Sequence, residues 1–389
     1  MKKNKICLIM KNNEGWTGGS EYIKNILFSF SYLETNDRKK VELHLISFEN
    51  KNFNKSLEKY YDYLHTYDNL SPLFIRKLFK QKSFNKLKEF IFTFLTVLRW
   101  KINFVFPFPN YLSFLGINSA LWIPDFQHHY LDKFFSNKEI QYRNKKFKKI
   151  VRNSSLLVLS SKDSRKDLNK FYQKENKKVF VLNFRANLNR LWLKENPEQT
   201  IKKYHLPDKF FLISNQFWKH KNHLLVFKAL DYLKNKKNIK PIIVFTGKLF
   251  YGDDSYGKEI IAEIKKLNIN NQIFILGLIP KKDQFLLMRK SIAIIQPSLF
   301  EGWSTIVEES RSIGKNIILS DLGVHKEQNF SRSIFFQRNS YEDLALKISY
   351  AFEKFRPGPN KNEENLFARK HKILMQNFAK RFLLLSNIK

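Results

Sequence analysis

The sequence predicts an α/β protein with two doubly wound, Rossmann-like domains. The chain has 389 residues, more than one hydrophobic core usually covers, so two domains are expected. A hydrophobic content of 43% is sufficient for two cores. Short runs that are apolar throughout alternate with helical patterns, which is typical of parallel sheets covered by helices on both faces.

The expected strands follow one another along both halves of the chain. They are residues 6–10, 41–47, 102–106, 120–123, 156–160, 179–183, 210–214, 241–246, 273–277, 292–296 and 316–320. Helical patterns lie between many of them, and Val226, Leu230 and Leu233 fall on one helical face.

The strand pattern lapses over residues 185–200, which divides the chain into predicted domains 1–195 and 196–389. A turn-rich segment, 356–365, precedes a last helix at about residues 364–386. We expect this helix to pack back onto the N-terminal domain.

The charge of the chain is strongly positive. Lys and Arg number 70 and Asp and Glu 35, which gives a net charge of +35. Such a charge suits nucleic acid, an anionic membrane surface or a phosphorylated substrate, although a general bias toward Lys, Asn, Ile and Phe contributes to it. Nucleic-acid binding would predict zinc ligands or basic-aromatic motifs, and the sequence has none, so we expect no nucleic-acid partner.

The sequence predicts a cytoplasmic protein. Cys7 is the only cysteine, which excludes an internal disulfide and suits a reducing compartment. The N-terminal segment is too short for a signal peptide, and no apolar run reaches the roughly 18 residues of a membrane span. Residues 77–101 interleave basic residues with Phe, Leu and Trp. They predict peripheral contact with the inner face of the plasma membrane; an ordinary helix with a basic outer face is the alternative.

Candidate site residues follow four of the predicted strands, where parallel sheets bind ligands. The first junction contains Gly15, Gly18 and Gly19 before a helix, which suits close approach of the backbone to phosphate. The spacing is not that of the dinucleotide-binding fingerprint, and a tight turn alone would explain one of the glycines.

The second junction, residues 122–136, brings Asp125, His128 and His129 into one loop. A neutral imidazole there can accept a proton or bind an acceptor hydroxyl, although a loop histidine pair is often incidental. No further His or Cys set has ligand spacing, so we expect no metal.

The third junction, residues 210–230, has Asn215, Gln216, Lys219 and Lys221 between a strand and a helix. The two lysines can neutralise a diphosphate and the two amides can donate hydrogen bonds to it. The alternative is that they are ordinary surface lysines.

The fourth junction places Glu301 and Glu309 on either side of a turn that begins a helix. We expect Thr305 and Glu308 to form a capping box, which leaves Glu309 free to point elsewhere. Backbone amides between the two acids can bind phosphate while each carboxylate binds a sugar or ribose hydroxyl. These amides belong to Gly302, Trp303, Ser304 and Thr305.

With these residues the sequence resembles the large retaining family-4 glycosyltransferases of the GT-B fold, most strongly over residues 205–330. The E-x7-E motif of that family is matched by Glu301 and Glu309, and its glycine loop by the segment with Gly18 and Gly19. Lys221 stands at the family's phosphate-binding lysine. The sequence departs from the family at two positions. Gln216 stands where an arginine is common, so we expect Lys219 to take over phosphate binding. Pro124 stands where the family has a histidine before Asp125.

The resemblance implies two facing domains with the active site in the cleft between them. It implies a hexosyltransferase that needs no metal or other cofactor, with a nucleotide diphosphate sugar as donor and a glycan or lipid-linked glycan of surface polysaccharide as acceptor. Glu301 would contact the donor sugar, Glu309 the ribose and Lys221 the phosphates, and we expect His128 to assist the sugar. A basic nucleic-acid-binding protein, a non-catalytic carbohydrate-binding protein, and an epimerase or phosphorylase on the same fold are the alternatives.

Overall fold

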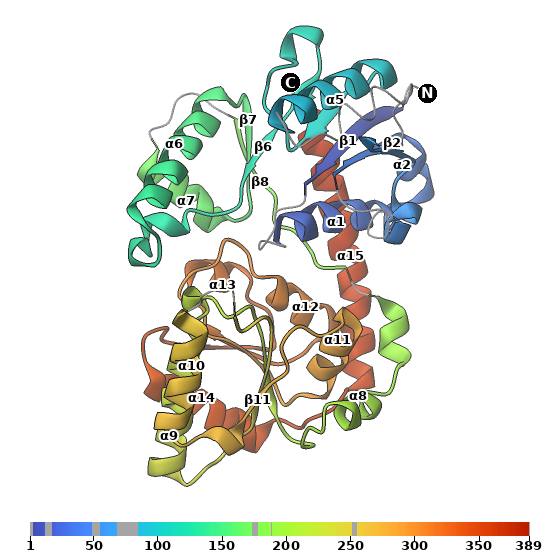
Figure 1. The fold of residues 1–389 in the computed structure, drawn as a ribbon. Coiled ribbons are helices and arrows are strands. Elements are labelled where there is room, and N and C mark those ends of the chain that lie inside the picture. Colours follow the sequence, from blue (N-terminus) through green and yellow to red (C-terminus); the bar gives the residue numbers. More distant parts are fainter. Residues whose placement is uncertain are drawn as a thin grey trace.

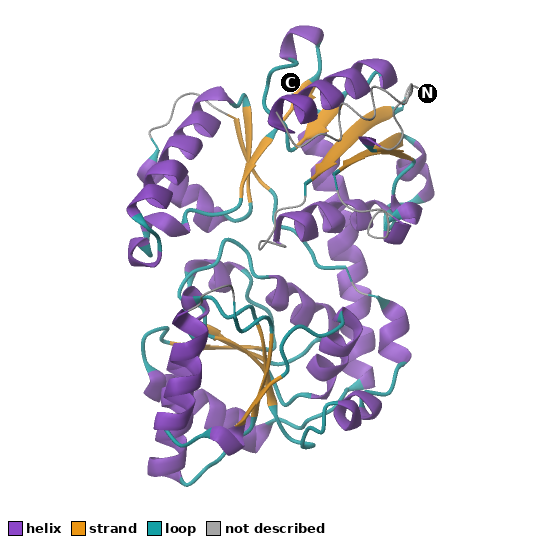
Figure 2. Ribbon diagram, in the orientation of Figure 1, coloured by secondary structure: helices purple, strands orange, loops and turns teal. Residues whose placement is uncertain are grey.

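The protein consists of two α/β halves with a long C-terminal helix running beside both, as the computed structural model in Figures 1 and 2 shows. The structure describes residues 3–11, 18–48, 55–67, 85–172, 178–187, 189–250 and 255–388. Gly15 and residues 77–84 of the predicted membrane-contacting segment lie outside the described residues.

The N-terminal half is built on a parallel sheet of strand order β3-β2-β1-β4-β5. Its strands are β1 (Asn4–Met10), β2 (Val41–Ser47), β3 (Tyr63–His65), β4 (Phe104–Phe106) and β5 (Asn118–Ser119). Helices α1 (Gly18–Phe30), α2 (Thr35–Lys39) and α5 (Asn85–Trp100) connect them.

Strand β1 is apolar throughout because both faces of its sheet are covered. Ile6 and Leu8 pack with the residues of α1, whereas Cys7 and Ile9 pack with those of α5. Cys7 is a fully buried thiol, as its position in an apolar strand predicts.

A second, three-stranded parallel sheet completes the N-terminal half. It contains β6 (Leu121–Ile123), β7 (Leu156–Leu159) and β8 (Lys178–Val181), with α6 (Asn137–Asn153) and α7 (Lys162–Phe171) between the strands. Helix α6 begins with a capping box formed by Ser136 and Glu139, and Ser161 caps α7. These caps fix where the two helices start.

The C-terminal half has a six-stranded parallel sheet of order β11-β10-β9-β12-β13-β14, the doubly wound order of a Rossmann fold. Its strands are β9 (Phe211–Ser214), β10 (Ile243–Thr246), β11 (Ile273–Ile275), β12 (Ile294–Gln296), β13 (Ile317–Ser320) and β14 (Ser333–Phe336). The strand order reverses between β9 and β12.

Helices cover both faces of this sheet. They are α8 (Glu198–Lys203), α9 (His223–Lys237), α10 (Ser255–Lys266), α11 (Lys281–Lys290), α12 (Thr305–Ile313), α13 (Gly323–Glu327) and α14 (Tyr341–Lys354). One core joins the sheet to α9, α10 and α14, and the other joins it to α8, α11 and α12. Val226, Leu230 and Leu233 are buried in the first core, which confirms the predicted helical face.

Short 3-10 helices occur in several connections. They are η1 (Glu58–Tyr60), η3 (Ser113–Leu115), η4 (Gln127–His129), η5 (Asp132–Phe134), η6 (Arg190–Lys194), η7 (Lys219–Lys221) and η8 (Asn270–Gln272).

The last helix, α15 (Lys361–Ser386), contacts both halves. Near its start, Ala368 packs in a core of the C-terminal half. Near its end, the Phe382 ring centroid lies 6.0 Å from that of Phe104 and 5.5 Å from that of Phe106, in the N-terminal sheet. The two halves are therefore held together by packing along this helix (Figure 1).

Candidate functional site

The strand order reverses between β9 and β12. In such sheets ligands bind at the carboxyl ends of the strands beside the reversal, and we call this place the crevice. The loops that follow the two strands lie against each other there. Asn215 Nδ2 donates to Gln296 Oε1 at 2.9 Å, and the Leu299 amide donates to the His220 carbonyl at 2.8 Å. The third and fourth predicted junctions therefore form one site.

Glu301 is the most strongly held acid in this crevice. Its Oε1 accepts hydrogen bonds from Lys221 Nζ at 2.6 Å, Gln296 Nε2 at 2.7 Å and Ser298 Oγ at 2.7 Å. Burial is the largest single influence and acts to raise the pKa of the carboxyl. The charge of Lys221, its hydrogen bond and further nearby groups together outweigh burial, so the pKa lies below its usual value. Glu301 is therefore ionised at neutral pH and fixed in position.

Positive charge in the crevice comes from Lys219 and Lys221, because the neighbouring histidines are neutral. Burial lowers the pKa of His220 and of His223 to about 3. Lys219 is exposed. The side-chain oxygen of Gln216 accepts from the Lys248 amide at 2.8 Å, so this residue supplies no charge where the family commonly has arginine.

Two helices point uncapped N-termini at this edge of the sheet. Helix α9 follows Asn222 and α12 follows Ser304, and neither residue makes a side-chain capping bond. The first amide N–H groups of a helix have no partner within the helix and carry partial positive charge. An anion, above all a phosphate, fits such a position.

Glu309 lies on α12 and pairs with a lysine that the sequence analysis did not single out. Its Oε1 accepts from Lys281 Nζ at 2.5 Å, and Gln284 Nε2 lies 3.5 Å from its Oε2. Both partners come from the first turn of α11. The two acids of the E-x7-E motif thus have separate lysine partners, Lys221 and Lys281. No local pattern in the sequence indicates this pairing, because Lys281 lies 28 residues before Glu309.

The predicted capping box at Thr305 and Glu308 is wrong. Ser304 is the N-cap residue, and its amide donates to Gln328 Oε1 at 3.0 Å. Glu308 instead accepts two bonds from Arg185 Nη1, at 2.9 and 2.8 Å, and one from Gln328 Nε2. A half-buried arginine from the other half provides a stronger partner than a backbone amide.

The N-terminal half reaches this crevice through the loop after β6. A Cβ atom at Gly302 would lie 2.3 Å from the Pro124 carbonyl oxygen and 2.9 Å from Asp125 Cβ, so only glycine permits this contact. Burial raises the pKa of Asp125, and the charges of Glu301 and Lys221 also act on it. Asp125 therefore lies beside Gly302, the residue that follows Glu301.

The structure does not bring His128 into this arrangement. Its side chain is 1% exposed and its Nε2 lies 3.1 Å from Asn144 Oδ1 of α6. Burial lowers its pKa to about 4. Its neighbour His129 stacks on Phe171 with a ring separation of 4.1 Å. No hydrogen bond or ion pair joins His128 to Glu301 among the described residues, so its catalytic role stays a prediction.

The remaining predicted residues have distinct places. Gly18 and Gly19 begin α1, directly after a segment outside the described residues. Trp303 is largely buried and donates from Nε1 to the Phe184 carbonyl at 3.0 Å, so its side chain serves the junction of the halves. Gly247 allows the two backbones to approach closely, since a Cβ atom at this position would lie 2.1 Å from the backbone carbonyl oxygen of Asn215.

Within the described ranges, no group of three or more His, Cys, Asp or Glu residues is placed to hold a metal ion. Nor does any helix in this part of the chain have the length and apolar character needed to cross a membrane.

Comparison with known proteins finds a family model that matches most of the C-terminal half. Residues 196–365 match the family model described as glycosyl transferases group 1. A matching relative is the N-acetylgalactosamine-N,N'-diacetylbacillosaminyl-diphospho-undecaprenol 4-alpha-N-acetylgalactosaminyltransferase of Campylobacter jejuni, 26% identical over 168 residues. The match covers 43% of this chain and 42% of that protein, less than half of each.

Similar solved structures cover nearly the whole chain. HepE of Anabaena, solved with UDP and glucose, matches 99% of this chain and 100% of its own with a TM-score of 0.67 and 16% identity. A glycosyltransferase of Rickettsia africae has a TM-score of 0.65 and 17% identity over 99% of this chain and 97% of its own. WaaG, a lipopolysaccharide glycosyltransferase, has a TM-score of 0.61 and 12% identity over 96% and 95%.

The chain has the GT-B fold. This confirms the predicted α/β class and the two Rossmann-like domains. The match to the glycosyl transferases group 1 model is confined to residues 196–365, whereas the likeness in fold extends over nearly the whole chain.

Proposed function

We propose that the protein is a retaining glycosyltransferase that moves a hexose from a nucleotide diphosphate sugar to a hydroxyl of a lipid-linked glycan. The observation that carries the proposal is the crevice at β9 and β12. It combines a fixed carboxylate, Glu301, with Lys221 and two uncapped helix N-termini. A diphosphate needs the positive groups, and a sugar needs the acceptor oxygens.

In this proposal the chain itself stabilises the diphosphate leaving group. Lys221 has three N–H donors, so it can keep its bond to Glu301 and donate another to a phosphate oxygen. Lys219 and the first amides of α9 and α12 add positive charge where negative charge develops as the glycosidic bond breaks. No metal is required for these steps.

Glu301 and Glu309 would bind the two ends of the donor. Glu301 accepts hydrogen bonds from hydroxyls of the transferred sugar, and Asp125, beside Gly302, faces the same sugar from the N-terminal half. Glu309 accepts from the ribose hydroxyls, exchanging its contact with Lys281 for them. The geometry favours Asp125 over His128 for the contact with the sugar.

We also propose that the acceptor is reached at the inner membrane surface. The Campylobacter jejuni relative is named for a diphospho-undecaprenol acceptor, and this chain matches 42% of that protein. Helix α5 offers an exposed apolar face made of Leu87, Ile91, Leu95 and Leu98. Their spacing places all four on one side of the helix, with Arg99 and Lys101 exposed next to them.

The test begins with a thermal-shift screen of UDP, GDP, dTDP, ADP and CMP sugars. The sugar that stabilises the protein is then offered with polyprenyl-diphosphate-linked acceptors, and the product anomer is read by proton NMR. We expect transfer with retention, lost in Glu301→Gln and kept in Glu353→Gln, whose carboxylate is exposed on α14.

Other outcomes identify the alternatives. Stabilisation without turnover would indicate a binding protein, and a changed sugar without transfer would indicate an epimerase. If Glu301→Gln transfers sugar at the wild-type rate, the active site does not lie in this crevice.

A further inference from the structure

A cavity of about 560 Å³ lies in the C-terminal half, away from the crevice just described. Lys315 and Asn316 line it directly before β13, and Arg332 lines it directly before β14. These are the amino ends of the strands. The crevice at β9 and β12 lies at the carboxyl ends, so the parallel sheet separates the two sites.

Cations outnumber anions in the lining of this cavity. Arg289 is neutralised by Glu364, with bonds of 2.7 and 3.0 Å, and Arg332 pairs with Glu363. Four further cations line the cavity: Lys315, Lys354, Arg356 and Lys361. Within the described residues, none of these four forms an ion pair with an acidic side chain.

Lys315 is the most deeply buried of these four side chains. The side chain is 8% exposed, and its Nζ donates to the Arg289 carbonyl at 3.0 Å and to the Ser291 carbonyl. Burial lowers its pKa to about 7, and the charge of Arg289 acts in the same direction, against that of Glu364. A bound anion would favour the charged form of Lys315.

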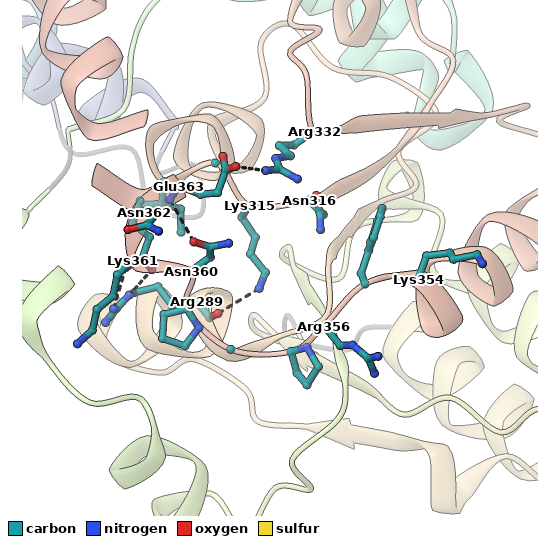
Figure 3. Close-up of a pocket in the computed structure, with 17 residues that line it drawn as sticks. Arg289, Lys315, Asn316, Arg332, Lys354, Arg356, Asn360, Lys361, Asn362 and Glu363 are labelled. Atoms are coloured by element: carbon teal, nitrogen blue, oxygen red, sulfur yellow. Dashed lines mark hydrogen bonds and ion pairs between the residues drawn. The ribbon is translucent and has the colours of Figure 1, made fainter. Parts of the chain in front are cut away.

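The cavity also contains hydrogen-bond donors without charge. It lies at the N-terminus of α15, where Asn360 caps the helix through a bond from the Glu363 amide to its side-chain oxygen. The side-chain amide NH₂ of Asn360 is then left to face the cavity. Figure 3 shows Lys315, Asn316, Asn360 and Arg332 around one open space, with Lys354, Arg356 and Lys361 at its rim.

We propose that this cavity binds a small phosphorylated molecule. Its volume is that of a small-molecule site, and the excess of cations, the amide donors and the start of a long helix all favour phosphoryl oxygens. The site is separate from the proposed donor site and does not depend on it. Since α15 runs from here to the N-terminal sheet, a ligand would contact the helix that joins the halves.

Calorimetry with sodium tripolyphosphate, inorganic phosphate and glucose 6-phosphate tests the proposal. The titrations use the full chain carrying Lys219→Ala and Lys221→Ala, so that phosphate binding in the other crevice is weakened. We expect saturable binding of at least one probe. Asn316→Asp, which adds a negative charge at almost constant shape, should weaken it by at least about tenfold. Lys354→Ala with Arg356→Ala should also weaken it.

Matched variants on α6 serve as controls. Asn153→Asp and the pair Lys148→Ala with Lys149→Ala change the same charges at exposed positions of that helix. They should leave binding unchanged. Equal losses in both sets would mean general attraction to a basic protein, and no binding by any probe would mean that the cavity is not such a site. Either result overturns the proposal and leaves the glycosyltransferase proposal unaffected.

Discussion

At the residue scale, the site consists of acids that are each held by a lysine from another element. Glu301 is bound by Lys221 at 2.6 Å and Glu309 by Lys281 at 2.5 Å. A carboxylate held this way keeps its orientation before a substrate arrives, which reduces the cost of ordering it on binding. The lysines also offset the negative charge of the two carboxylates, which would otherwise repel a bound diphosphate.

Glu309→Ala should weaken binding of the cognate nucleoside diphosphate by one to two decades. Charge-assisted hydrogen bonds contribute roughly 1.5–3 kcal/mol, and this variant loses those to the ribose. Because ribose is common to both ligands, the loss should be equal for the diphosphate and its sugar conjugate. Calorimetry measures it, with Glu353→Ala on α14 as the control. Wild-type affinity in Glu309→Ala would show that the ribose binds elsewhere.

Lys221→Ala should lower turnover more than it lowers nucleotide affinity. The charge on the diphosphate rises as the glycosidic bond breaks, so the lysine contributes more in the transition state than in the ground state. Steady-state kinetics and calorimetry on the same preparation separate the two effects. Lys228→Ala removes an exposed lysine of α9, the helix that follows Lys221, and should change neither. Normal turnover in Lys221→Ala contradicts the assignment.

At the element scale, the positions of most strands and their alternation with helices could be predicted, because both depend on local apolar patterns. The junctions after β9 and β12 could be placed at one edge because carboxyl ends of parallel strands share it. The partner of Glu308 could not be predicted. In place of the predicted capping box, Glu308 binds Arg185, which lies 123 residues earlier in the chain. No local sequence pattern indicates such a distant contact. Lys281 was missed for the same reason.

The direction of the His128 side chain could not be predicted either. Its position in a loop after a strand indicated the crevice, but the loop turns into η4 and buries the ring against Phe147 of α6, 5.1 Å between centroids. The direction of a side chain within a loop depends on tertiary packing, which cannot be inferred from the local sequence. The contact of the neighbouring Pro124 with Gly302 depends likewise on how the halves meet.

A buried histidine pair in the N-terminal sheet predicts how stability changes with pH. His65 of β3 lies 2.9 Å from His44 of β2, which in turn bonds Glu42 at 2.9 Å. Burial, together with the charge of His44, lowers the pKa of His65 to about 4, below the usual 6.5. Between these values the unfolded chain binds more protons than the folded one, so stability falls as the pH falls.

This histidine should contribute about 1.4 kcal/mol per pH unit to the loss of stability between pH 6.5 and 4. Other buried histidines add to it, since burial lowers the pKa of His128 and of His371 to about 4. Urea unfolding measured across this range should therefore show a shallower slope in His65→Gln than in the wild type. His205→Gln, at an exposed position, should keep the wild-type slope. Identical slopes in all three proteins would rule out the role of His65.

At the scale of the whole molecule, several contacts join the halves near the crevice. Arg185 reaches Glu308 of α12, and Glu327 of α13 accepts from the Lys162 amide at the start of α7. The packing of α15 joins the halves farther away. The crevice is thus bounded by both halves, as the proposed transfer between a donor and an acceptor requires.

The exposed face of α5 has a consequence for the whole molecule. Leu87, Ile91, Leu95 and Leu98 are 56, 38, 52 and 41% exposed, whereas Phe92 and Val97 on the other side of the helix are buried. Phe114 in η3 is 77% exposed, and Tyr111 packs against Phe90 of α5, so the apolar surface extends beyond the helix. In Figure 1, α5 lies on the side of the N-terminal half that faces away from the C-terminal half.

An apolar face beside basic residues on a chain of net charge +35 should bind anionic membranes reversibly. In flotation with vesicles of phosphatidylglycerol and phosphatidylcholine, we expect binding at low salt that decreases as salt screens the charges. Leu95→Asn with Leu98→Asn should abolish it. Leu346→Asn with Tyr350→Asn, both 51% exposed on α14, should not. If the wild type stays with the unbound fraction at low salt, or if both pairs of substitutions act alike, α5 is an ordinary surface helix. Binding that is lost only with the α5 pair would mean that the protein meets the membrane with this face of α5.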